Sequence, residues 1–374
     1  MWRRLHSTLA RCVVFDKTGP PTQVLSVRDV PLPPLTRRSV HLGMLAFPIN
    51  PADINQVEGV YPIRAHRLDS EPALHVGGNE GVARVLAVGD EAAAHVQPGD
   101  WVLPATPASG TWRTDMMVDY TQIVRLPRHE ALTLLQAATL SVNPCTAYRM
   151  LKDFVDLAPG EVVLQNGANS AVGQAVTQIA HAWGLHTLNV IRDRPDFDQV
   201  AQQLKSIGAD CVIRDTEMRS AETQQWLQSV AGSQPPRLAL NGVGGKSAQN
   251  LARLLGVGGT IVTYGAMSRQ PFMFPASAFI FNDLRARGFW MSRWTEERVA
   301  GRDAAKQAML GDLVEMMRQG QLAGPRAELT TWGDEADAAA SLACFMGAVQ
   351  KAGSSMAGKK QVVLVAAHQS ASSE

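Results

Sequence analysis

Cysteine is scarce in this chain. Only four cysteines occur among 374 residues, at positions 12, 145, 211 and 344, and no two of them form a C-x-x-C pair. This spacing argues against a disulfide framework and against a structural zinc site built from four thiolates. It implies a reducing or neutral compartment.

Neither sign of charge is in excess. Lys plus Arg number 35 and Asp plus Glu number 34, which gives a formal net charge of +1. No overall field therefore draws the chain to nucleic acid or to an anionic membrane. No apolar run approaches the roughly 18 residues that a membrane-spanning helix needs. Any site for an anionic ligand is expected to be local.

Acidic residues are absent from the N-terminal segment before Asp16. Residues 1–11, MWRRLHSTLAR, hold three arginines, a serine and a threonine. This composition is typical of mitochondrial transit peptides. The alternative is a frayed basic terminus, and we expect import into an organelle.

The remaining chain has ordinary globular composition, 45% hydrophobic and 18% charged, and a length that predicts two domains. From Cys12 to about Leu126, short strand-like runs broken by Gly and Pro predict a β-rich, barrel-like domain. From about Glu161, buried runs alternate with helical segments, which predicts an α/β fold with a doubly wound parallel sheet. The run 361–366, QVVLVA, is expected to return to the first domain as a strand, and the tail from His368 is expected to be disordered.

A turn of small residues follows the first of these buried runs. The segment 167–173, GANSAVG, connects the run at 162–164 to a helix with one apolar face. Small residues at a strand-to-helix turn allow backbone N–H groups to approach a pyrophosphate. The segment departs from strict G-x-G-x-x-G, so a turn without a ligand remains the alternative.

Three charged residues end the second strand of this domain, Arg192, Asp193 and Arg194. An acid at this place accepts from a ribose 2′-hydroxyl, whereas arginine accommodates a 2′-phosphate. Two guanidiniums beside one carboxylate favour NADPH. In the alternative, both arginines are solvated and Asp193 selects NAD.

The two-domain pattern resembles the medium-chain dehydrogenase/reductase superfamily, which implies a GroES-like catalytic domain and a Rossmann cofactor domain. We expect the former at 12–141 and 325–374 and the latter at 142–324. Zinc alcohol dehydrogenases of this superfamily carry a ligand cysteine three residues before an aspartate, and a G-H-E triplet. Here those places read Asn50 before Asp53, and Gly78-Asn79-Glu80. Neither offers a thiolate or an imidazole, so we expect no metal and favour conjugate reduction over alcohol oxidation.

Several strings in order narrow this resemblance: INPADINQVEGVYP (49–62), HVGGNEGVARV (75–85), PGDWVLPA (98–105), SGTWRT (109–114), SVNPCTAY (141–148), VIRDRPD (190–196), TYGAMS (263–268) and RGFWMSRW (287–294). Together they resemble the mitochondrial trans-2-enoyl-thioester reductases, which are zinc-free members of the superfamily. The resemblance implies NADPH-dependent reduction of 2-enoyl groups carried on acyl carrier protein or coenzyme A, during fatty-acid synthesis in the mitochondrial matrix. It also implies a homodimer.

The resemblance assigns roles to individual residues. Tyr61 matches the catalytic tyrosine, whose neutral phenol suits the stabilisation or protonation of an enolate. The implied NADPH contacts are Asn143, Asn169, Ser170, Ala171, Val172, Arg192, Asp193, Arg194, Tyr264, Gly265, Ala266, Met267, Phe289, Trp290, Met291, Ser292 and Lys360. Ala171 departs from the family's NSGV turn, and we expect its methyl group to weaken cofactor binding modestly. Phe289 and Trp290 are interpreted as adjacent aromatics on a strand, which point to opposite faces.

Two other functions remain compatible with the sequence. One is an NADPH-dependent quinone or alkenal reductase of the same superfamily. The other is a non-catalytic NADPH-binding regulatory protein, against which the intact string around Tyr61 argues.

Overall fold

The computed structural model describes residues 9–70, 73–127, 129–232, 234–297, 304–335, 337–353 and 359–371. The chain divides into two compact units, residues 1–142, 292–318 and 324–374 in the first, and residues 143–291 and 319–323 in the second. Residues 292–318 thus group with the first unit and not with the cofactor domain, where the sequence analysis put them. One reason is visible in helix α11 (Ala304–Arg318), where Lys306 donates to the carbonyl of Ala105, 2.5 Å away.

The first unit is rich in β-strands. Its strands are β1 (Leu9–Phe15), β2 (Ser26–Pro31), β3 (Ser39–Pro48), β4 (His66–Arg67), β5 (His75–Val76), β6 (Val82–Val88), β7 (Trp101–Pro104), β8 (Asp115–Asp119), β9 (Ile123–Arg125), β16 (Ala327–Trp332) and β17 (Lys360–Val365). Its helices are α1 (Pro21–Val24), α2 (Pro51–Glu58), α3 (Leu134–Ala138), α11 and α12 (Ala338–Gly353), with 3₁₀ turns at Ala92–Ala94, Tyr120–Gln122, His129–Ala131 and Ala366–Ala371.

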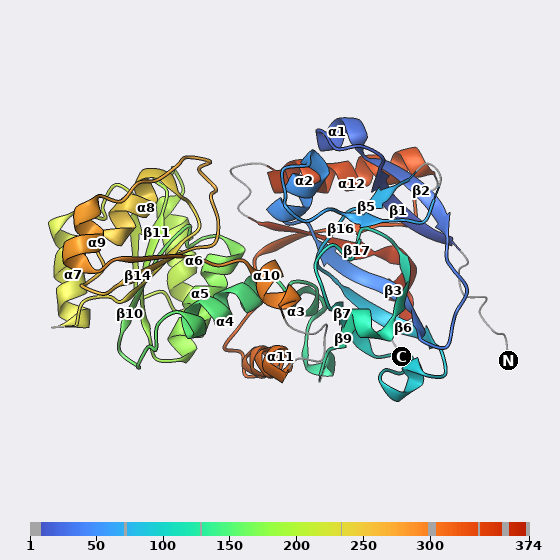
Figure 1. The fold of residues 1–374 in the computed structure, drawn as a ribbon, viewed down its shortest axis with the longest axis horizontal. Helices are drawn as coiled ribbons and strands as arrows, with labels where there is room; N and C mark the ends of the chain where they lie inside the picture. The colour runs from blue at the N-terminus through green and yellow to red at the C-terminus, as the bar shows by residue number, and fades with distance from the viewer. Residues whose placement is uncertain are drawn as a thin grey trace. The chain divides into compact units, whose positions relative to one another are not determined.

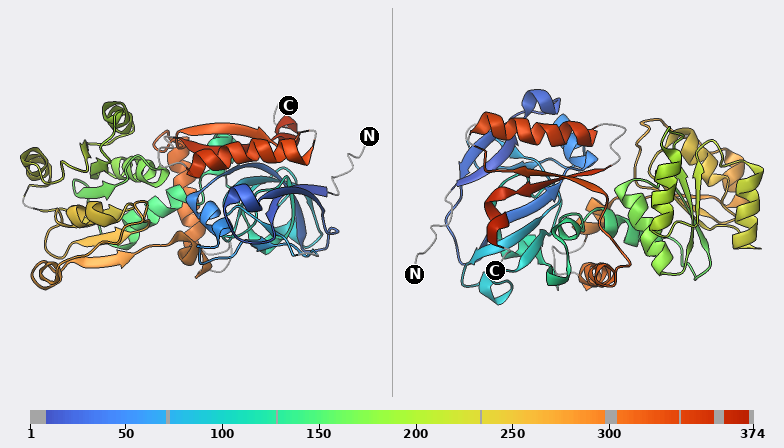
Figure 2. Two further views of the ribbon diagram at one scale, coloured as in Figure 1. Left: turned by 90° about the horizontal axis from the view of Figure 1, so that it is seen from above. Right: turned by 180° about the vertical axis from the view of Figure 1, so that it is seen from behind.

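Two sheets form the frame of this unit. One has the strand order β2-β1-β5-β4, and the other has the order β16-β17-β3-β6-β7-β9, with β8 also paired to β3. Strand β17 runs parallel to β16 and antiparallel to β3, with Val363 opposite Phe47. The predicted return of the C-terminal strand to the first domain is confirmed. Helix α12 lies against β2, β16 and β17 in the views of Figures 1 and 2.

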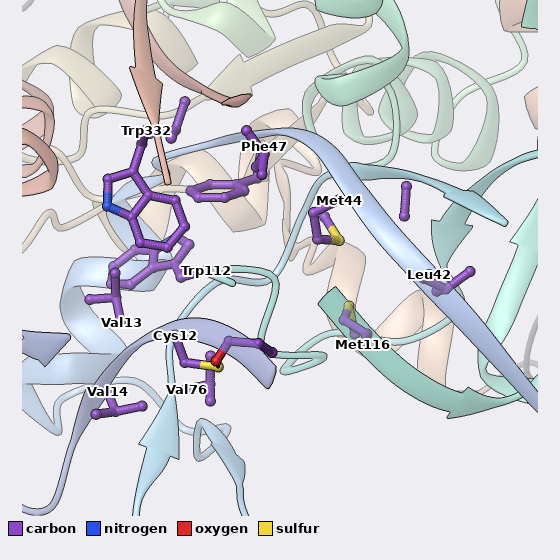
Figure 3. Close-up of a cluster of buried hydrophobic side chains, with 14 of the residues drawn as sticks. Cys12, Val13, Val14, Leu42, Met44, Phe47, Val76, Trp112, Met116 and Trp332 are labelled. Atoms are coloured by element: carbon purple, nitrogen blue, oxygen red, sulfur yellow. The ribbon is translucent and has the colours of Figure 1, made fainter. Parts of the chain in front are cut away.

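Aromatic side chains fill the core of the first unit (Figure 3). Trp112, Trp332, Phe47 and Phe345 are fully buried, and the Trp112 and Phe345 rings meet edge to face at 4.9 Å. Burying a large apolar side chain stabilises the fold by about 1.5 to 3 kcal/mol. A side chain at Gly77 would come within 2.4 Å of the Trp112 ring, so glycine there permits the indole to pack.

The second unit is a parallel sheet between helices (Figure 1). Its strands are β10 (Val162–Asn166), β11 (His186–Ile191), β12 (Cys211–Arg214), β13 (Leu238–Asn241), β14 (Thr260–Thr263) and β15 (Arg285–Gly288). Its helices are α4 (Asn143–Asp153), α5 (Ala171–Ala182), α6 (Phe197–Ser206), α7 (Ala221–Ala231), α8 (Gly245–Ala252) and α9 (Ala276–Asn282). Helix α10 (Met291–Glu296) has its first residue in this unit and the others in the first unit. The order β12-β11-β10-β13-β14-β15 is all parallel, which confirms the doubly wound sheet.

Two predictions differ from the structure: the strand position of Phe289 and Trp290, and the disorder of the tail from His368. Phe289 and Trp290 follow β15 and do not lie within it, so the argument from strand alternation does not apply to them. The tail forms a 3₁₀ turn up to Ala371, in which His368 lies 3.3 Å from Asp115, and Asp115 also bonds His41 at 3.1 Å. Burial alone would raise the pKa of Asp115, yet the hydrogen bonds with His368 and His41 lower it to about 2.

The N-terminal segment is described only from Leu9 onward, so residues 1–8 of the predicted transit peptide lie outside the described residues. Residues 9–11 belong to β1, where Leu9 pairs with Pro31 and Arg11 with Asp29. Three residues of the predicted leader thus lie in a strand of the first unit. None of the helices in the described ranges has the length and apolar content of a bilayer-spanning segment.

Candidate functional site

The predicted phosphate-binding turn joins β10 to α5 in the second unit. Ser170 precedes the helix, and its hydroxyl accepts a hydrogen bond from the N–H of Gly173 at 3.1 Å. The N–H groups of Ala171 and Val172 belong to the first turn, which an α-helix leaves without intrahelical acceptors. Gly173 is required by packing, since a Cβ there would lie 2.5 Å from the Ala168 carbonyl oxygen. A helix start at the carboxyl end of a central strand suits a pyrophosphate.

Tyr264 brings a second predicted segment to this turn. Its phenol shares a hydrogen bond with Ser170, and burial raises the pKa of the phenol to about 12. The Tyr264 N–H donates to Asn241 at 3.0 Å, and that of Met267 donates to Gly242 at 3.1 Å. The segments 169–172 and 264–267 therefore lie together at one edge of the sheet.

Asn143 supplies an independent sign of a ligand in the second unit. The residue is 8% exposed, and its Nδ2 atom has no hydrogen-bond partner among the described residues. A buried donor without an acceptor costs about 1 to 3 kcal/mol. The carboxamide thus fits a bound polar group, and with the helix start at Ser170 the second unit fits a dinucleotide such as NADPH.

The residues expected to select the cofactor lie just after β11. Arg194 donates to Asp196 through two nitrogens, and Asp193 accepts from Arg214 Nε at 3.1 Å. Arg214 ends the neighbouring strand β12 and lies 3.8 Å over the Phe197 ring. The loop thus holds a third arginine that the sequence analysis missed, because only strand pairing brings it there.

Phe289 to Ser292 leave the sheet at its edge. The Phe289 N–H donates to Thr263 at 2.9 Å, and the Phe289 ring packs edge to face on Phe154 at 6.0 Å. Trp290 is half-buried and Met291 is buried. Ser292 opens the segment that belongs to the first unit.

Tyr61 lies in the first unit, in the loop after α2. Gly59 ends the helix in the left-handed conformation, with φ at +80°, and the N–H of Tyr61 donates back to the Asn55 carbonyl at 3.2 Å. The Tyr61 hydroxyl lies 3.4 Å from Ser292 Oγ. Two residues that are 231 positions apart, both predicted for the site, therefore meet here.

A buried polar cluster underlies the start of α2. Asn50 Nδ2 donates to Glu80 Oε2 at 2.8 Å, and Lys360 Nζ donates to the side-chain oxygen Oδ1 of Asn50. Asn79 donates to Asp53 Oδ1 at 2.6 Å. Burial raises the pKa of Glu80 to about 7 and also raises that of Asp53, while it lowers the pKa of Lys360. The Lys360 ammonium attracts both carboxyls and so opposes the effect of burial on their pKa values.

This cluster does not suit zinc. The two places that carry ligands in zinc alcohol dehydrogenases hold amides, and both amides are already used in hydrogen bonds within the cluster. Zinc prefers thiolate, imidazole and carboxylate ligands. Over the described ranges, no group of three or more His, Cys, Asp or Glu side chains could hold a metal ion.

Two strand-terminal asparagines also escaped the sequence analysis. Asn166 ends β10 and donates to Asn241 Oδ1 at 2.9 Å, while its own oxygen accepts from the Gly242 N–H at 2.8 Å. Asn241 in turn donates to Thr263 at 3.1 Å. These bonds fix the strand ends that carry the turn and Tyr264. The sequence signal that could have identified them is an asparagine at the end of each mostly apolar run, VVLQN and LALN.

Known proteins resemble the chain over most of its length. A family model described as zinc-binding dehydrogenase matches residues 171–306. The mitochondrial enoyl-[acyl-carrier-protein] reductase of Rattus norvegicus is 47% identical over 315 residues, which cover 84% of this chain and 80% of that protein. The Homo sapiens protein of the same name is 46% identical over the same shares. The mitochondrial 2-enoyl thioester reductase Etr1p/Etr2p heterodimer from Candida tropicalis matches with a TM-score of 0.88 and 32% identity, over 96% of this chain and 100% of that chain.

Proposed function

Since the chain belongs to the family of mitochondrial enoyl-[acyl-carrier-protein] reductases, we propose that it reduces trans-2-enoyl thioesters to saturated thioesters with NADPH. A solved structure of Etr1p with NADP and crotonyl-CoA, 31% identical with a TM-score of 0.88 over 96% of this chain and 100% of that chain, supports this reaction. Acyl groups on acyl carrier protein or coenzyme A are the expected substrates.

The position of Tyr61 carries the proposal. When bound, NADPH supplies the hydride for the β-carbon of the enoyl group, which leaves negative charge on the thioester oxygen. The Tyr61 phenol donates to this oxygen or protonates the α-carbon. Ser292 Oγ, 3.4 Å away, can orient the phenol. The places of the zinc ligands hold the hydrogen-bonded amides of Asn50 and Asn79, so the acid role falls to a titratable side chain and not to a metal.

The reaction is tested by NADPH oxidation with crotonyl-CoA as substrate. We expect turnover with crotonyl-CoA and far slower oxidation with a quinone or an alkenal. A faster reaction with the quinone would favour the other reductase class. NADPH affinity without turnover of any of the three would favour a binding protein.

For the cofactor, we expect Arg192 and Arg194 to hold the 2′-phosphate of NADPH. A charge-assisted hydrogen bond contributes about 1.5 to 3 kcal/mol. Replacing both arginines by alanine should therefore raise the KM for NADPH at least about tenfold and leave the KM for NADH nearly unchanged. Equal losses with both cofactors would contradict the assignment. Asp193 stays bound to Arg214 in this variant, so the loop keeps one of its ion pairs.

The relatives in this family are mitochondrial proteins, and the mitochondrion is the location of this chain as well. We propose that residues 1–8 direct the import. Deleting residues 2–8 should leave the enzyme active but in the cytosol, because the deletion stops before β1. Imaging of a tagged protein checks this, and an unchanged location would contradict the role of the segment.

The edge of the parallel sheet supports a homodimer as the assembly. All four residues of β15 are exposed, and α9, which precedes it, carries Phe279, Ile280 and Phe281 with exposed fractions of 45%, 70% and 75%. An exposed edge strand beside apolar side chains invites pairing with another chain. A second copy placed by a twofold axis would cover both features.

Lysines at Ile280 and Phe281 should therefore separate the dimer into monomers. Sedimentation velocity measures the change, and Leu329→Lys, at an exposed position of the first unit, serves as the control. A wild-type protein that sediments as a monomer would contradict the proposal.

A further inference from the structure

We propose that Gln56 is a positioning residue, which holds the Tyr61 loop in place. It does so through the hydrogen-bonded side-chain amides of Gln56 and Asn79, which we call the amide clamp. The inference rests on the role proposed for Tyr61. Gln56 lies on α2, one turn before Tyr61, and is 4% exposed.

The amide clamp holds the loop beyond Tyr61. Gln56 Nε2 donates to the carbonyl of Ile63 at 3.0 Å, two residues after the tyrosine. On the other side of Tyr61, the N–H groups of Val60 and Tyr61 donate to the Asn55 carbonyl at 2.9 and 3.2 Å. Helix backbone thus fixes the start of the loop, whereas one side chain fixes its end.

Asn79 fixes the orientation of the Gln56 amide. Its Nδ2 atom donates to Gln56 Oε1 at 3.1 Å, so the Gln56 nitrogen is directed to Ile63. Asn79 is itself fixed on three sides: it donates to Asp53 Oδ1 from both its backbone and its side-chain nitrogen, and its oxygen accepts from the Ala108 N–H at 2.7 Å. The place that carries a zinc ligand in the zinc-dependent members of the superfamily here supports the loop of the acid residue.

Gln56→Met tests the amide clamp, because methionine has a similar size but cannot donate to Ile63. Misplacing a reacting group by about 1 Å lowers rates up to about 100-fold. We expect kcat to fall about 10- to 100-fold while the KM for NADPH stays close to that of wild type, and the melting temperature should fall because the Ile63 carbonyl and Asn79 Nδ2 each lose a hydrogen-bond partner. Glu58→Gln, on the same helix, is the matched control. A Gln56→Met enzyme with wild-type kcat would overturn the proposal.

Gln56→Glu adds a readout that a purely structural residue would not give. A protonated carboxyl can donate to the Ile63 carbonyl, whereas a carboxylate cannot. The kcat of this variant relative to wild type should therefore rise as pH falls from 8 toward 6. The charged groups that face this position are Asp53, through Asn79, and beyond it Lys360 and Glu80. A kcat ratio that is constant with pH would overturn the proposal, even if Gln56→Met fails to fold.

A double-mutant cycle with Tyr61→Phe separates the amide clamp from the proposed function. If Gln56 acts through the phenol, Gln56→Met should cost almost nothing further in the Tyr61→Phe background. Additive losses would overturn the positioning role and leave the role of Tyr61 intact. A Tyr61→Phe enzyme with normal kcat would overturn the role of Tyr61, and with it that of Gln56.

Discussion

Tyr61→Phe is expected to lower kcat about 10²- to 10⁴-fold, the usual contribution of a positioned general acid. The variant removes one oxygen and little volume from a half-buried side chain, so folding and NADPH binding should survive. The hydrogen bond strengthens only as charge develops on the substrate oxygen, and kcat therefore bears most of the loss while KM changes little.

Three measurements on Tyr61→Phe distinguish a catalytic from a structural tyrosine: kcat with crotonyl-CoA, NADPH affinity and melting temperature. A structural tyrosine would give a different result. Losing its contact with Ser292 would lower the free energy of unfolding by about 1 kcal/mol and leave turnover nearly intact. A weakened protein with near-normal kcat would thus contradict the proposed mechanism.

Lys360→Met should have the largest effect on stability. The substitution removes the hydrogen bond to Asn50 Oδ1 and the positive charge that attracts the buried carboxyls of Glu80 and Asp53, and losing a hydrogen bond to a charged group costs about 1.5 to 3 kcal/mol. The free energy of unfolding should fall by this amount, which urea denaturation followed by tryptophan fluorescence can measure. Lys359→Met is the control, because Lys359 is the exposed neighbour in sequence.

The same variant separates two roles for Lys360, which the resemblance assigns to NADPH binding. A residue that only contacts the cofactor would give weaker NADPH binding and unchanged stability. If the buried cluster is the main role, adding Glu80→Gln to Lys360→Met should restore part of the lost stability, because it removes one of the unbalanced charges. If Glu80→Gln restores no stability, this would contradict the attraction between Lys360 and the buried carboxyls.

The sequence predicts most of the second unit because its signals are local. Strands such as β10 and β13 are short, mostly apolar runs followed by a helix or by turn residues, as at Gly167 before α5, whereas the edge strand β15 is exposed and has no apolar signal. The parallel order then follows from the connections between neighbouring strands. In contrast, the grouping of α11 with the first unit depends on packing such as that of Lys306 against Ala105, which no local pattern encodes.

In the candidate site, too, residues with a local sequence signal are predicted, whereas contacts made by packing are not. Tyr61 was found because the string around it resembles a family, and the turn at Ser170 because small residues follow a strand. The sequence pattern does not predict the contacts that support these residues, because those contacts join segments that are distant in the sequence. Arg214 reaches the loop after β11 through strand pairing, and Gln56 contacts Asn79 only because α2 packs beside the segment that follows β5.

The placement of β17 has a consequence for synthesis on the ribosome. The second unit is almost continuous in the chain, so its sheet can form as soon as residue 291 has emerged. The first unit cannot be completed then, because β3 still lacks a neighbour and Asn50 lacks Lys360, which is made 310 residues later. The cofactor half of the protein is therefore expected to fold first, while the half that carries Tyr61 matures only after nearly the whole chain has been translated.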